Sequence, residues 1–135
     1  MRVRRPVVAA ALVAALLLST VVAGLHRYPV ASPSRPGGGY HLALAGGTLE
    51  GQVNLDGTAC MWLGEGLHRT AIYWPYGYTA GGWPFSVYDE SGKRLASVGQ
   101  RVWLGGGFLP DSVNSIPGCS GFDRFWGASP GLSVA

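Results

Sequence analysis

Short apolar runs separated by glycine-containing turns dominate the chain from about Ala45 onward. They recur at roughly the 8–12-residue spacing that is typical of β-sandwiches and small barrels. Glycine occupies 22 of the 135 positions, and no stretch of the domain keeps the period of about 3.6 residues that an amphipathic helix needs. The pattern therefore predicts an all-β domain and excludes one built from long helices.

The first three predicted strands follow one another as a meander. Residues 47–55 alternate apolar and polar side chains, which is typical of a half-buried strand. Asp56 and Gly57 form a hairpin turn, and residues 59–63 return along the first strand. A third strand over residues 68–74 ends before Pro75, because proline has no N–H to donate to a sheet.

Further short strands are predicted at residues 85–89, 94–98, 101–104 and 122–126. Gly105 to Gly107 end the third of them abruptly and indicate a bend or a bulge. An open sheet of this size would leave its edges unpaired and its apolar face uncovered. We therefore expect a small closed antiparallel barrel of five or six strands, OB-like, with a two-sheet β-sandwich as the alternative.

The N-terminus carries a hydrophobic segment that directs the chain to a membrane. Three arginines within residues 1–5 precede an uncharged apolar stretch over residues 7–25. The arginines favour a cytoplasmic N-terminus, so the rest of the chain is sent outward. Residues 1–25 are either a signal peptide cleaved near Ala23 or an uncleaved helix that anchors the chain in the membrane. Both place the domain outside the cytoplasm, at the cell envelope.

Composition divides the rest of the chain. Residues 26–44 are rich in proline, glycine and serine and are predicted to form a tether, because such a segment cannot bury enough apolar surface to offset its ordering entropy. Residues 45–129 are the predicted β domain, and residues 130–135 a C-terminal tail.

The distribution of charge argues against nucleic acid as a partner. The net charge is +3, but half of the ten basic residues lie before the domain, whereas all seven acidic residues lie within it. The domain itself is mildly acidic. Without a basic stripe it lacks the electrostatic footprint that phosphate binding requires.

Four short motifs of the domain carry a resemblance. They are residues 60–63, 74–78, 88–92 and 99–107. Together they resemble a group of small exported bacterial proteins, secreted or membrane-anchored, of uncharacterised function. The resemblance implies an exported β domain and brings no activity or ligand with it.

Cys60 and Cys119 are the two cysteines of the chain. In a chain sent to an oxidising compartment they most simply pair with each other. Neither belongs to a Cys-x-x-Cys motif, so thiol exchange chemistry has no support. We therefore predict a structural disulfide, with a metal site or free thiols as the alternatives.

The domain offers little catalytic chemistry. His68 is its single histidine, and no Gly-x-Ser-x-Gly motif is present. A carboxylate pair for glycoside cleavage remains the enzymatic alternative. Its candidates are Glu50, Glu65, Asp89, Glu90, Asp111 and Asp123. We assign no catalytic residue, no metal ligand and no cofactor.

The least ordinary stretch is an aromatic connection over residues 73–85, rich in glycine and proline. Aromatic side chains on loops of a rigid scaffold can anchor a partner or stack on sugar rings. The alternative is a lid that folds back over one end of the barrel. The possible binding surface comprises Trp74, Tyr76, Tyr78, Trp83 and Phe85.

These features together favour a non-catalytic binding or accessory module of the cell envelope, with an envelope protein or a glycan as partner. The alternatives are a small cell-wall hydrolase that uses a carboxylate pair, and a binder of small apolar ligands inside the barrel.

Overall fold

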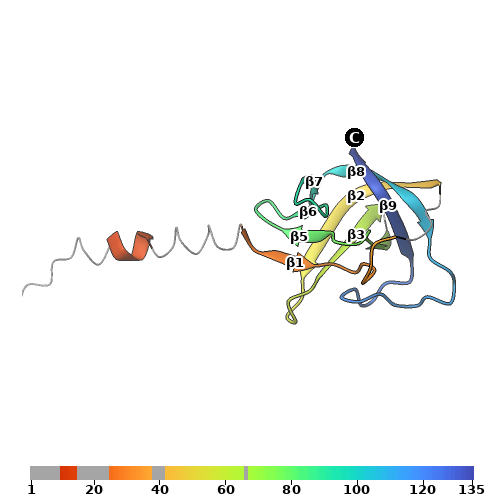
Figure 1. The fold of residues 1–135 in the computed structure, drawn as a ribbon, viewed down its shortest axis with the longest axis horizontal. Coiled ribbons are helices and arrows are strands. Elements are labelled where there is room, and N and C mark those ends of the chain that lie inside the picture. Colours follow the sequence, from red (N-terminus) through yellow and green to blue (C-terminus); the bar gives the residue numbers. More distant parts are fainter. Residues whose placement is uncertain (1–9, 15–24, 38–41, 66) are drawn as a thin grey trace, which may run out of the picture.

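The computed structural model describes residues 10–14, 25–37, 42–65 and 67–135 (Figure 1). Residues 10–14 are helical and exposed, and the rest is mostly β. Nine strands are present in the described ranges: β1 (Arg27–Pro29), β2 (Ala43–Val53), β3 (Ala59–Glu65), β4 (His68–Tyr73), β5 (Thr79–Gly81), β6 (Ser86–Tyr88), β7 (Arg94–Ser97), β8 (Arg101–Phe108) and β9 (Phe125–Val134).

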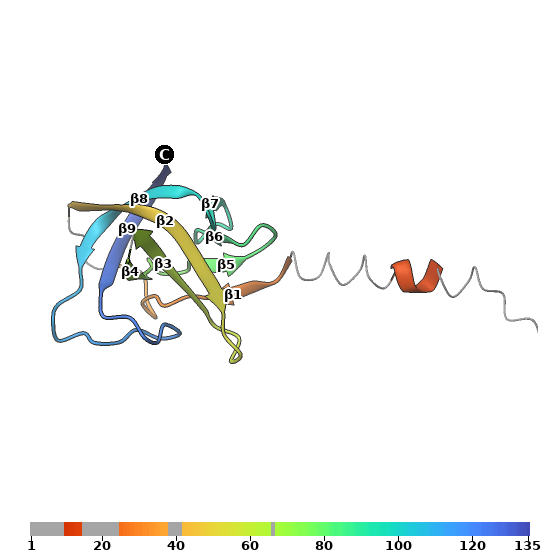
Figure 2. The ribbon, with the colours of Figure 1, turned by 180° about the vertical axis from the view of Figure 1, so that it is seen from behind.

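Five strands are hydrogen-bonded in a closed ring, in the order β2, β3, β4, β9, β8 and back to β2 (Figures 1 and 2). All neighbours in the ring are antiparallel except β4 and β9, which run parallel. Strand β2 closes the ring because it is long enough to pair twice. Thr48 to Val53 pair with β3, and Ala43 to Thr48 pair with β8.

The remaining strands form a second sheet in the order β1, β5, β6, β7, antiparallel throughout. Its last three strands lie between β4 and β8 in the sequence, and the sheet lies beside the ring in both views (Figures 1 and 2). A single parallel bridge from Val30 to Ala59 connects the residue after β1 to β3.

The all-β prediction is confirmed, since the structure has two sheets and the strands of one of them form a ring. Strands β1 and β5 were not predicted, because each is only three residues long and they lie in the proline- and glycine-rich stretches 26–44 and 73–85. The predicted N-terminal hydrophobic segment falls largely outside the described residues. Among those described, no helix is long and apolar enough to cross a membrane.

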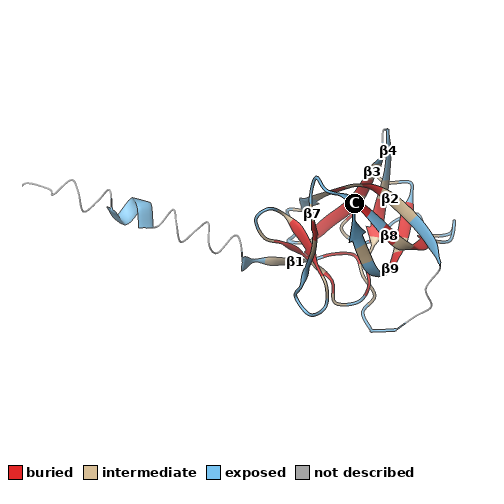
Figure 3. Ribbon diagram, turned by 90° about the horizontal axis from the view of Figure 1, so that it is seen from above, coloured by how far each residue is buried: buried red, intermediate tan, exposed pale blue. Residues whose placement is uncertain are grey.

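One apolar core fills the ring and continues under the second sheet (Figure 3). Along β8 the burial alternates, since Val102 and Leu104 are buried whereas Trp103 between them is exposed. The largest fully buried side chains include Leu49, Met61, Ile72, Leu104 and Trp74. Burial of an aliphatic side chain of this size contributes about 1.5–3 kcal/mol, so these residues dominate the stability.

Three predicted boundaries need correction. The domain begins before residue 45, because β1 belongs to the second sheet and the adjacent Val30 and Ala31 are buried in the core. The predicted C-terminal tail over residues 130–135 is part of the domain up to Val134, because β9 runs to that residue. Strand β8 does not end at the glycines but continues through Gly105–Gly107 to Phe108. The bend or bulge expected there is present as a shift in the register of β8 against β9.

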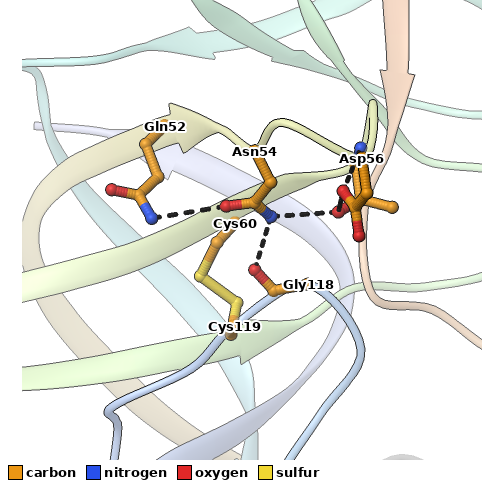
Figure 4. The surroundings of a disulfide bond; sticks show 7 residues. Gln52, Asn54, Asp56, Cys60, Gly118 and Cys119 are labelled. Carbon is orange, nitrogen blue, oxygen red and sulfur yellow. Dashed lines mark hydrogen bonds between the residues drawn. A yellow bond between two sulfur atoms is a disulfide. The ribbon is translucent and has the colours of Figure 1, made fainter.

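The predicted disulfide is confirmed. Cys60 in β3 and Cys119 in the loop after β8 are bonded, with their Cα atoms 5.1 Å apart (Figure 4). Beside the bond, the side-chain amide of Asn54 donates to the carbonyl oxygen of Gly118 at 2.7 Å. The two contacts hold loop 109–124 against the strands. A second apolar cluster lies beneath it, formed by Ala31, Cys60, Ala71, Ile116, Cys119 and Phe125.

Candidate functional site

The five aromatic residues predicted as a binding surface lie in three different environments. Trp74 and Tyr78 are buried, with exposed fractions of 1% and 9%, and their rings stack with centroids 5.9 Å apart. Phe85 is half-buried and packs against the core. Tyr76 and Trp83 are exposed. The aromatic connection therefore contributes to the core through two members and to the surface through two others.

A cleft of about 600 Å³ lies beside this connection. Its walls are the loop 73–78, the turn 89–91, the segment 33–37 before β2, and residues 127–130 of β9. Trp74, Tyr76 and Tyr78 line it, whereas Trp83 and Phe85 do not. The cleft thus gathers residues from four distant parts of the sequence.

The sequence explains the conformation of loop 73–78, which forms one wall of the cleft. Pro75 ends the ladder of β4, and the amide of Tyr78 turns back to donate to the carbonyl of Pro75 at 3.3 Å. Gly77 takes a φ of +80°, and a Cβ at this position would lie 2.9 Å from Cγ of Glu90. Glycine is therefore required where the loop and the turn 89–91 come together.

The cleft wall formed by residues 33–37 is held in place just before its first residue. The amide of Trp74 donates to the carbonyl oxygen of Ala31 at 2.8 Å, which holds the buried Ala31 beside the end of β4. Pro33 and Pro36 follow and line the cleft. Part of the predicted tether is therefore a wall of the site.

Asp89 organises the turn 89–91, which forms another wall of the cleft. Its Oδ1 accepts hydrogen bonds from the Ser91 amide at 2.9 Å, the Ser91 hydroxyl at 2.6 Å and the Lys93 amide at 3.0 Å. The Ser91 hydroxyl is the main cause of a lowered pKa of Asp89, and the Lys93 amide is the next. Asp89 therefore presents an ionised carboxylate at the cleft, with the exposed Glu90 beside it.

Acid titration tests this turn. The pKa of Asp89 is lower in the folded chain than its unfolded value of about 3.9, so its stabilising contribution is complete above that value and is lost as the pH falls through the folded pKa. We expect Asp89→Asn to lessen the decline of the urea midpoint below about pH 4, because asparagine accepts the same bonds without titrating. Asp111→Asn, in the exposed loop, is the control and should keep the wild-type slope. If the urea midpoint of Asp89→Asn falls with pH as steeply as that of wild type, the stabilising role of the ionised Asp89 is contradicted.

Trp74 contributes an unusual polar group to the site. Its indole N–H is buried and has no hydrogen-bond partner among the described residues. A buried donor left without a partner costs about 1–3 kcal/mol, and because the indole nitrogen itself is buried, it is not presented to the cleft. No sequence signal could have shown this, because the burial of Trp74 depends on Ala31 and on the core.

The carboxylates of Asp89 and Glu90 line one cleft, as the hydrolase alternative requires. Glycoside cleavage needs one carboxyl group as the proton donor and a second one that is ionised, and the lowered pKa of Asp89 suits only the ionised role. Glu50 accepts a hydrogen bond from the indole of Trp62, and Glu65 lies 3.5 Å from Arg101. His68 is exposed at the start of β4. In the part of the chain that is described, no three His, Cys, Asp or Glu residues gather as metal ligands.

Comparison with protein-family models, curated proteins and solved structures finds no match for this chain. The resemblance to small exported bacterial proteins stays a prediction.

Proposed function

We propose that this chain is an exported, non-catalytic binding module that holds a ligand in the cleft between loop 73–78 and turn 89–91. The observation that carries the proposal is the cleft of about 600 Å³, which brings aromatic and proline side chains together with the ionised carboxylate of Asp89. A ligand with an apolar part and a positive or hydrogen-bond-donating group complements these walls. Clefts of this size with aromatic walls and few polar groups are typical binding sites.

We further propose that the ring is an OB-type barrel. We number the five ring strands by their order in the sequence. Around the ring they then follow one another as first, second, third, fifth, fourth and back to first, and the third and fifth run parallel, as in that fold. The meander of β5, β6 and β7 stands between the third and fourth ring strands. OB folds commonly bind ligands on the face of their second and third strands. Here loop 109–124 packs on that face through the second apolar cluster, which favours the neighbouring cleft as the binding site.

Export is the remaining part of the proposal. The disulfide is compatible with a location outside the cytoplasm. Residues 1–25 supply the signal peptide or membrane anchor, so the partner is sought in the cell envelope, either a protein or a glycan.

Two exposed aromatic residues allow a matched test. Tyr76 is 37% exposed and lines the cleft, whereas Trp83 is 89% exposed and does not. We expect Tyr76→Ala to weaken retention of the full chain, in detergent, on immobilised envelope extract by about fivefold or more, because truncating an aromatic anchor costs more than about 1 kcal/mol. Trp83→Ala should bind as wild type. An equal loss in both variants, or none in Tyr76→Ala, would overturn the cleft as the binding site.

A further inference from the structure

We infer that the domain lies directly on the surface of a lipid bilayer, with the second sheet toward anionic headgroups and Trp83 among them. The inference rests on the proposed export, with residues 7–25 retained as the membrane anchor, and it does not involve the cleft. Three observations carry it: the place where the domain begins, the exposure of Trp83, and two arginines gathered beside it.

The domain begins almost immediately after the apolar segment. Residues 7–25 contain no charged side chain and are long enough to span a bilayer as a helix. Strand β1 starts at Arg27, which pairs with Gly81, and the buried Val30 follows. Two residues span at most about 7 Å, so Arg27 lies within that distance of Leu25. A chain anchored by residues 7–25 therefore keeps the start of β1 at the level of the headgroups.

Strand β5 brings Trp83 to the same end of β1. Gly81 is opposite Arg27, and a Cβ at Gly81 would overlap the carbonyl oxygen of His26. Trp83 follows two residues later and is 89% exposed. Figures 1 and 2 both show the second sheet on the side of the domain where β1 begins. Tryptophan is enriched at membrane interfaces because its ring is apolar while its N–H is polar.

Two arginines are gathered beside Trp83. The guanidinium of Arg27 lies over the Tyr88 ring, 3.8 Å from its centroid. The guanidinium of Arg94 donates to the hydroxyl of Tyr88 from Nε at 3.4 Å and from Nη2 at 3.3 Å. That hydroxyl lies against Gly82, since a Cβ at Gly82 would overlap it. Both positive charges therefore lie close to the residue that precedes Trp83.

The charge of this face suits an anionic lipid surface. The four strands of the second sheet contain Arg27 and Arg94 and no acidic residue. Asp89 and Glu90 lie in the turn after β6, at the cleft, whereas loop 82–85 precedes β6. Arginine binds phosphate oxygens through a planar fork of N–H groups. Anionic headgroups therefore complement the two arginines, while the tryptophan ring lies at headgroup level.

Quenching by brominated lipids tests the contact. The full chain is reconstituted in nanodiscs of phosphatidylcholine and phosphatidylglycerol, with and without bromine on the acyl chains, and its tryptophan fluorescence is recorded. We expect brominated lipids to quench the wild-type chain and Trp83→Phe to lose most of this quenching. Trp103→Phe, at a 39% exposed position in β8 of the ring, is the matched control and should retain it.

Substitution of an arginine tests the headgroup preference. The quenched fraction gives the ratio of docked to undocked domains. Arg94→Gln should lower this ratio by about fivefold in the anionic discs, because each arginine near an anionic surface favours docking by about that factor. It should have little effect in discs of phosphatidylcholine alone. Arg101→Gln, in β8, is the control and should leave the ratio unchanged in both.

Two outcomes overturn the inference. One is a wild-type chain that is not quenched, or is quenched no more than Trp83→Phe. The other is a chain recovered from cells with its start at Gly24, although export would then still stand. Neither outcome bears on the cleft, because the Tyr76→Ala test uses detergent, which removes the bilayer and keeps Trp83→Ala a valid control there. Binding that depends on Tyr76 therefore leaves the proposed function standing when the contact at Trp83 fails.

Discussion

Reduction of the disulfide between Cys60 and Cys119 should lower the free energy of unfolding by about 4 kcal/mol, because the bond closes a long loop and restricts the unfolded chain. The two cysteines are 59 positions apart in the sequence, and both are buried. Since small domains are stable by only about 5–15 kcal/mol, this loss removes a large part of the total. Urea denaturation with and without reductant measures it.

The loosened region should be loop 109–124. The loop is held by few backbone bonds, such as the Val113 amide to the Pro110 carbonyl and the Cys119 amide to the Ile116 carbonyl. Without the disulfide, the loop keeps the bond from Asn54 to Gly118, the apolar cluster beneath it and the packing of Phe122 on Trp62 and Arg69. We expect chymotrypsin to cut after Phe122 in the reduced chain before it cuts within β2 to β4.

A double variant isolates the effect of the bond. Cys60→Ala combined with Cys119→Ala should be as unstable as the reduced wild type and should not respond to reductant. A wild-type midpoint that is unchanged by reductant, with both thiols shown free by alkylation, would contradict the prediction. So would cleavage that begins in the ring strands.

Alternation and turn chemistry were sufficient to predict most ring strands. The hairpin at Asp56 and Gly57 was predicted because both residues suit a tight turn, and the structure has it between β2 and β3. The last strand was predicted over residues 122–126, but β9 runs from Phe125 to Val134 and contains Pro130 and Gly131. In the structure Ala128 pairs with Gly106 and Leu132 pairs with Leu104, so the residues between them leave the register. This irregularity lets a proline lie within a strand.

The site was predictable only in part. The aromatic connection was recognised from its composition, but the sequence does not show that Trp74 and Tyr78 turn inward while Tyr76 remains at the surface. The opposite walls come from residues 33–37 and 89–91, and their approach depends on long-range contacts that no local pattern encodes. The disulfide was predictable because the chain has just two cysteines and an N-terminal segment that is predicted to direct export.

Gly106→Ala should destabilise the chain by about 3 kcal/mol or more, because two costs coincide at this position. Gly106 has a φ of +136°, which side-chain-bearing residues rarely adopt. A Cβ there would also overlap the carbonyl oxygen of Gly127 in the neighbouring strand. Relief of the overlap requires β8 and β9 to separate where the indole of Trp126 donates to the carbonyl of Gly105.

Gly99→Ala is the matched control. Gly99 also has a positive φ, of +94°, but a Cβ at this position would meet nothing within 4 Å. Gly99→Ala should therefore lower the free energy of unfolding only by the cost of holding alanine at a positive φ, about 1–2 kcal/mol. Urea denaturation of both variants separates backbone strain from steric overlap, because only Gly106 combines the two. Equal losses would show that the contact between β8 and β9 at Gly127 can open without cost, and the tight approach of these strands would not be what requires glycine at residue 106.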